Sequence, residues 1–185
     1  MKMKSSMLAV LCAGVSVGSL QLATAQYNGG APGTAPAPAP TGSPGEAPIA
    51  CEVESRVAAL TGTAENPPVN PAGTGAASFG IRSRTEIFFS IAVSGLTSDI
   101  VGAHIHIGAP GVNGPIIFPL TPGGFTNSLS GVLRESDFRP APEQGINTFA
   151  EAINAVMNGN TYVNVHTANN PDGEIRGQIV AAQGQ

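Results

Sequence analysis

The sequence contains very little cysteine, almost no lysine and no tryptophan. Two of its 185 residues are cysteines, and charged residues make up only 11%. The only lysines, Lys2 and Lys4, stand at the start of the chain, and six arginines are scattered through the rest. Proteins that bind nucleic acid or an anionic membrane surface need clustered basic side chains. The composition therefore predicts neither kind of partner.

Residues 1–25 have the pattern of a secretory signal peptide. They read MKMKSSMLAVLCAGVSVGSLQLATA, with a basic start, a short apolar run and a small-residue end. The apolar run is too short and too often interrupted by glycine and serine to form a membrane span. We expect cleavage before Gln26 and a secreted, extracellular protein, or a periplasmic one in a bacterium. The mature chain then has six arginines against twelve acidic residues, a formal charge of −6.

Loss of the signal peptide removes Cys12 and leaves Cys51 as the single cysteine. One thiol cannot form a disulfide within its own chain, so the domain must be held together by its hydrophobic core. Cys51 is then buried, free, or paired with another chain.

Residues 26–50 are rich in proline, alanine and glycine, with GGAPGTAPAPAPTGSPGEAP at their centre. Alternating Ala-Pro favours an extended polyproline II conformation. The segment lacks the large apolar side chains that would offset the entropy lost on ordering. We therefore predict a disordered linker between the signal peptide and one domain at residues 51–182.

In residues 51–182, apolar and polar residues mostly alternate along short segments that are rich in β-branched and aromatic side chains. Turn-forming clusters such as NPPVNPAGTG and GAPGVNGP separate the segments. This pattern predicts a mainly β protein, an antiparallel β-sandwich or barrel-like Greek-key domain. The strands are expected at 55–62, 75–82, 85–96, 102–108, 115–120, 128–134, 161–167 and 173–181.

One segment has helical periodicity instead. Thr148 and Glu151 have the spacing of a capping box, and Phe149, Ile153 and Val156 fall on one helical face. Gly159 is a stop signal. We predict one short helix at 149–158, packed over an end of the sheet.

Three stretches of this sequence resemble the blocks of the CHRD domain, a family named after chordin and found in many secreted microbial proteins. They are LTGTAENPPVNPAGTGAASFGI, VSGLTSDIVGAHIHIGAPGVNGPIIFPL and NGNTYVNVHTANNPDGEIRGQI, in this order between Ala59 and Ile179. The resemblance implies an extracellular β-rich module without a settled chemistry. Nothing here resembles the cysteine-rich repeats of chordin, so its role as a growth-factor antagonist does not transfer.

The chain has only three histidines, and their spacing suggests a site. Alternate residues of a strand share a face, so His104 and His106 lie together, opposite Ile105. In the later strands, the same alternation separates polar residues from Val163, Val165 and Ile175. If these strands are neighbours, one surface gathers His104, His106, Asn164, His166, Glu174 and Arg176.

Such a surface has two interpretations. Three imidazole nitrogens suit Cu²⁺ or Zn²⁺, and Glu174 would add an oxygen ligand or accept the second ring N–H of a ligating histidine. Affinity would then fall below about pH 6.5, the ordinary histidine pKa. Alternatively the cluster is structural, with hydrogen bonds across strands and an ion pair of Arg176 with Glu174 or Glu65.

No enzymatic motif accompanies the histidines, and we predict that the protein is not an enzyme. The His-x-His strand with a late histidine faintly resembles copper–zinc superoxide dismutase, which needs more metal ligands, a bridging histidine and a disulfide. The sequence contains no G-x-S-x-G, phosphate loop or dinucleotide fingerprint.

Two functions remain open: a metal-binding extracellular module, and a structural or interaction module without metal. In the second, the segment PIIFPLTPGGF would contact an extracellular protein or a cell-surface partner, with Phe118 and Phe125 as anchors, unless both phenylalanines belong to the core.

Overall fold

A computed structural model describes residues 53–70 and 73–182 of the protein. The predicted signal peptide, the predicted linker and Cys51 lie outside the described residues. No helix within the described residues is long and apolar enough to cross a membrane.

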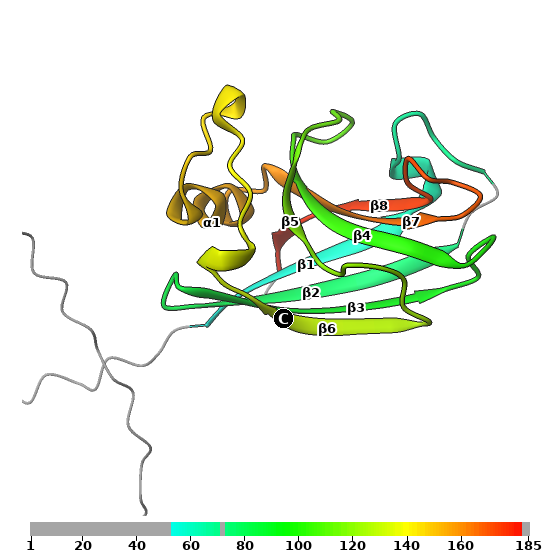
Figure 1. Cartoon of the computed structure of the whole chain (residues 1–185), viewed down its shortest axis with the longest axis horizontal. Helices are drawn as coiled ribbons and strands as arrows, with labels where there is room; N and C mark the ends of the chain where they lie inside the picture. Colours follow the sequence, from blue (N-terminus) through cyan, green and yellow to red (C-terminus); the bar gives the residue numbers. More distant parts are fainter. Residues whose placement is uncertain (1–52, 71–72, 183–185) are drawn as a thin grey trace, which may run out of the picture. The chain divides into compact units, whose positions relative to one another are not determined.

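The described residues form one antiparallel sheet of nine strands that curves into a nearly closed barrel (Figure 1). Its neighbours follow the order β5-β4-β7-β8-β1-β2-β3-β6, and β9 pairs with β1. The prediction of a barrel-like antiparallel domain is confirmed. The strands are β1 (Val53–Thr61), β2 (Thr74–Arg82), β3 (Glu86–Ser94), β4 (Ile100–Ile107), β5 (Ile116–Pro119), β6 (Ser128–Leu133), β7 (Thr161–Thr167), β8 (Ile175–Gln178) and β9 (Val180–Ala181).

Alternation of buried and exposed residues explains why these segments become strands. In β3, every second residue from Ile87 to Val93 is buried, and the residues between them are more exposed. The register pairs Phe79 of β2 with Phe89 of β3, so both strands point their apolar residues to the same side. The hydrophobic core fills the inside of the barrel.

β7 is different because nearly all of its residues are buried. It lies in the sheet between β4 and β8, and the core covers one of its faces. A loop from another part of the chain covers the other face, which carries polar side chains. This second, covered polar face is where the candidate site lies.

The predicted helix is present as α1 (Phe149–Met157), one residue shorter than expected. Thr148 and Glu151 form the capping box, and Thr148 Oγ1 accepts a hydrogen bond from Glu151 N at 3.2 Å. Phe149 packs edge-on against Phe118 of β5, with ring centroids 5.8 Å apart. Three short 3₁₀ helices complete the described structure: Gly62–Ala64, Glu135–Asp137 and Pro142–Gln144.

Candidate metal centre

Pairing of β4 with β7 brings the three histidines together. In this antiparallel pair His104 lies opposite Asn164, and His166 lies opposite Gly102. His104, His106 and His166 therefore share the face that points away from the core. Their ligand nitrogens all lie within 4.8 Å of one another, and the rings are partly buried.

Two backbone carbonyls fix the protonation of two of the rings. His106 Nδ1 donates to Gly114 O at 2.8 Å, and His166 Nδ1 donates to Pro171 O at 2.9 Å. A carbonyl oxygen only accepts, so each Nδ1 carries the proton and each Nε2 keeps a lone pair. His106 Nε2 is fully buried and has no hydrogen-bond partner within the described residues. Metal-ligating histidines are commonly held this way.

The third ring turns its Nδ1 toward His166. His104 Nδ1 lies 3.0 Å from His166 Nε2. Because His166 Nε2 carries the lone pair, His104 Nδ1 is the donor. Without a metal, the neutral cluster therefore has one internal N–H, and His106 Nε2 remains an unused acceptor.

The environment keeps all three imidazoles neutral at pH 7. Burial, and then the neighbouring His166, His106 and Arg139, lower the pKa of His104 to about 4. Burial also lowers the pKa values of His106 and His166, although their hydrogen bonds to backbone carbonyls oppose this. Neutral imidazole is the form that binds metal.

A stack of side chains supports His106. The ring of Tyr162 lies parallel to that of His106, with centroids 4.8 Å apart and an interplanar angle of 7°. The guanidinium carbon of Arg176 lies 3.3 Å from the Tyr162 ring centroid, a cation–π contact. Tyr162 comes from β7 and Arg176 from β8, so neighbouring strands help to hold one imidazole in place.

The loop at residues 108–115, here called the site loop, folds over this face. In Figure 1 it stands at the top of the view, next to the loop that follows β1. Arg176 donates to Asn113 Oδ1 at 2.9 Å and to Val112 O at 2.7 Å. Asn66 donates to Gly111 O at 2.8 Å, which ties the two loops together. The sequence predicted only a turn here, and it did not indicate that the carbonyl of Gly114 supports His106.

Glu174 does not have the predicted role beside the histidines. Its carboxylate accepts hydrogen bonds from the hydroxyls of Thr97 and Thr167, both at 2.6 Å, and from Gly73 N at 3.1 Å. Burial raises the pKa of Glu174, but these hydrogen bonds outweigh it and the net shift is downward. The ring N–H groups that Glu174 was expected to accept are bound by backbone carbonyls. The reason is local: Gly173, at φ +130°, precedes the start of β8, so Glu174 lies outside that strand.

The predicted ion pair of Arg176 with Glu174 or Glu65 is also wrong. The salt bridges in the described parts of the chain join other residues, and Arg176 donates to the site loop instead. Glu65 is buried, and its Oε1 has no hydrogen-bond partner there. Burial raises the pKa of Glu65 to about 7, although the charge of Arg176 opposes the shift.

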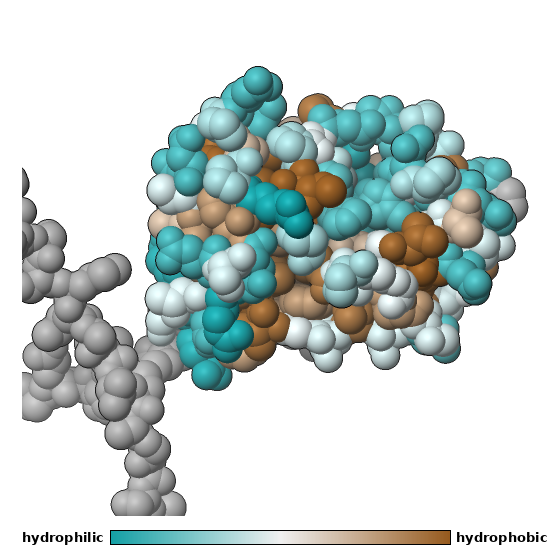
Figure 2. All heavy atoms as spheres, in the orientation of Figure 1, coloured by the Kyte–Doolittle hydropathy of each residue, from teal (hydrophilic) through white to brown (hydrophobic). Residues whose placement is uncertain are grey.

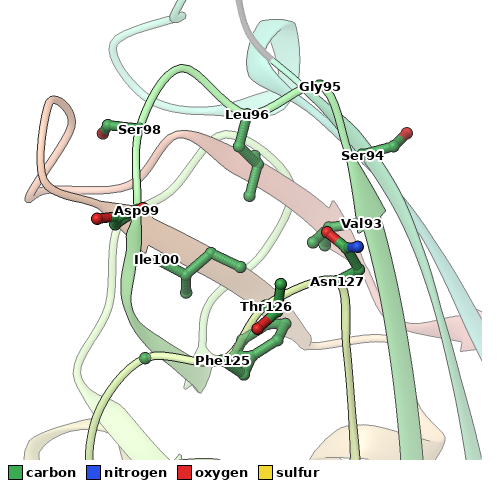
Figure 3. Close-up of a pocket in the computed structure, with 11 residues that line it drawn as sticks. Val93, Ser94, Gly95, Leu96, Ser98, Asp99, Ile100, Phe125, Thr126 and Asn127 are labelled. Carbon is green, nitrogen blue, oxygen red and sulfur yellow. The ribbon is translucent and has the colours of Figure 1, made fainter.

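A separate cavity of about 660 Å³ lies between the loop that joins β3 to β4 and residues 124–127. Leu96, Ile100 and Phe125 point into it (Figure 3). Phe118 is fully buried, so of the two alternatives given for it the core position is confirmed and the surface anchor is excluded. Hydrophilic and hydrophobic residues are interspersed on the face in Figure 2.

A comparison with models of known protein families finds a match. The family model described as CHRD domain matches residues 56–179, which confirms the resemblance found in the sequence. No curated protein and no solved structure matches the chain significantly.

Proposed function

The chain belongs to the CHRD domain family, and we propose that it is an exported, non-enzymatic binding module that holds one Cu²⁺ or Zn²⁺ ion on His104, His106 and His166. One observation carries this proposal: His106 Nε2 is buried without a partner, in a cluster whose ligand nitrogens lie within 4.8 Å. A buried acceptor without a donor is destabilising, and a bound cation removes that cost.

The donor set indicates the class of metal. Neutral imidazole nitrogens suit Zn²⁺ and Cu²⁺, whereas Ca²⁺ and Mg²⁺ prefer oxygen ligands. The lowered pKa values of the histidines keep this set ready to bind at neutral pH. The carbonyls of Gly114 and Pro171 orient two of the rings, so little rearrangement is needed at His106 and His166.

Export and the absence of catalysis rest on the sequence: the signal-peptide pattern of residues 1–25 and the lack of an enzymatic motif. The alternative is a structural or interaction module without metal. The hydrogen bond between His104 and His166 supports this alternative, because it joins β4 to β7 without an ion.

Metal titration distinguishes the two functions. Purified protein is titrated with Cu²⁺ and Zn²⁺ against a competing chelator, in a Cys51→Ser background because a thiolate also binds these metals. We expect one ion per chain with micromolar or tighter affinity. We expect His104→Ala, His106→Ala and His166→Ala each to weaken it by more than about 100-fold, since even the loss of a supporting residue costs 10–100-fold. Asn127→Ala, at an exposed position on the separate cavity, is the control. Unchanged binding in the histidine variants would leave the structural alternative.

A further inference from the structure

Asn164 lies at the centre of the polar face that carries the histidines. It is opposite His104 on β4 and Arg176 on β8, and His166 is two residues away on β7. Only 3% of Asn164 is exposed to solvent. A buried amide needs partners for both its oxygen and its nitrogen, so the direction of each atom indicates what the surroundings offer.

The amide nitrogen points away from the histidines. A Cβ placed on Gly173 would lie 3.1 Å from Asn164 Nδ2 and 2.5 Å from Glu65 Oε1. Glycine at this position thus lets the amide NH₂ group and the Glu65 carboxyl approach the same point. Asn164 Nδ2 therefore lies on the side of Gly173, and Asn164 Oδ1 lies on the side of the imidazoles.

The amide oxygen meets acceptors. Asn164 Oδ1 lies 3.0 Å from His166 Nε2, which carries a lone pair because His166 Nδ1 donates to Pro171 O. His106 Nε2 belongs to the same cluster, in which the ligand nitrogens of the three histidines lie within 4.8 Å of one another. Asn164 Oδ1, His166 Nε2 and His106 Nε2 thus converge, and His104 Nδ1 supplies the one N–H among them. A cation at this point would satisfy the three acceptors, and His104 Nδ1 would join them as a ligand once the proton of that ring lies on Nε2.

We propose, on the basis of the proposed function, that Asn164 Oδ1 is a fourth metal ligand and that the resulting set of three nitrogens and one oxygen favours Cu²⁺ in a tetragonal geometry. Metal–ligand bonds of about 2.0–2.1 Å place tetrahedral ligands about 3.3 Å apart, and ligands at right angles about 2.9 Å apart. His166 Nε2 lies 3.0 Å from both His104 Nδ1 and Asn164 Oδ1, a separation between these two values that one ion can bridge. Tetragonal coordination is typical of Cu²⁺, whereas Zn²⁺ is usually tetrahedral.

The test uses copper-loaded protein in the Cys51→Ser background. Asn164→Ala removes the oxygen, Asn164→Asp retains one, and Asn127→Ala is the matched control. We expect an axial, tetragonal Cu²⁺ electron paramagnetic resonance spectrum from the unsubstituted site. We expect Asn164→Ala to change this spectrum and to weaken Cu²⁺ binding about tenfold or more, and to weaken Zn²⁺ binding less. Asn164→Asp should restore the Cu²⁺ affinity.

The outcomes separate this proposal from the proposed function. If His106→Ala abolishes Cu²⁺ binding while Asn164→Ala leaves the spectrum and the affinity unchanged, Asn164 is not a ligand but the histidine site stands. A lower affinity with an unchanged spectrum and no rescue by Asn164→Asp also overturns the ligand role, because it indicates positioning alone. If the unsubstituted protein binds neither metal, the proposed function itself fails.

Discussion

At the scale of single residues, burial moves the pKa values of the three imidazoles away from the value of an exposed histidine. A solvent-exposed histidine has a pKa near 6.5, and the sequence alone therefore predicts that metal affinity declines below this pH. In the folded chain, burial lowers the pKa values of His104, His106 and His166, that of His104 to about 4. A proton competes with the metal for a ring nitrogen only when the pH approaches the pKa of that ring.

The pH dependence of copper affinity tests this point. We expect the affinity to be still nearly constant at pH 6.5, where an exposed histidine is half protonated, and to decline only at a lower pH, because the pKa values of the three histidines are lowered. Competition titrations between pH 8 and 4.5 measure this, with a short peptide that contains His-x-His as the reference. A decline that begins at or above the pH found for the peptide would show that the imidazoles are not desolvated as the structure has them.

At the scale of elements, the site loop determines how the histidines are presented. Its backbone, rather than its side chains, accepts the proton of His106 and binds Arg176. The close return of the loop to β4 depends on Gly114, because a Cβ at this position would overlap the carbonyl oxygen of Ile107. The glycine is needed here for the close approach of two backbones.

Gly114→Ala therefore should displace the site loop and break the hydrogen bond that orients His106. We expect metal affinity to fall about 10–100-fold, the usual loss when a residue that supports a ligand is removed. Gly123→Ala is the matched control, since a Cβ there meets nothing within 4 Å. Metal titration and thermal unfolding of both variants give the result. Equal affinities would mean that the loop does not orient the ligand.

At the scale of the whole molecule, the site couples segments that are distant in the sequence. β4 and β7 provide the ligands, β8 provides Arg176, and the loop after β1 provides Asn66. Unfolding separates all of these segments, so the unfolded chain has no preformed site. An ion that binds only the folded chain stabilises it in proportion to the logarithm of the metal concentration.

Saturating metal should therefore raise the melting temperature. At a free Cu²⁺ concentration 100 times the dissociation constant, the stabilisation is about 2.7 kcal/mol, which corresponds to roughly 10 °C for a domain of this size. Differential scanning calorimetry with Cu²⁺, and again after a chelator is added, measures the shift and its reversal. The variant that lacks all three histidines should show no shift. The same shift in that variant would place the binding elsewhere in the protein.

Local patterns predicted the elements well. The segment 161–167 is β7 with the same bounds, and Thr148 and Glu151 cap α1 as their spacing indicated. Strand alternation and helix capping depend on neighbouring residues, so they can be found in one sequence. The expected strand at 173–181 was less accurate, because β8 and β9 divide it and each pairs with β1 at different residues.

The sequence by itself determined that His104 and His106 share one face of a strand, because alternate side chains of a strand always do. Only the tertiary structure decided that His166 joins them, since this depends on the pairing of β4 with β7 across about 60 intervening residues. The tertiary structure also directs Glu174 to Thr167 and away from the histidines. The carbonyls of Gly114 and Pro171 accept the ring N–H groups that Glu174 was expected to accept. Every residue has a backbone carbonyl, so no sequence pattern indicates which ones the fold will bring to an imidazole.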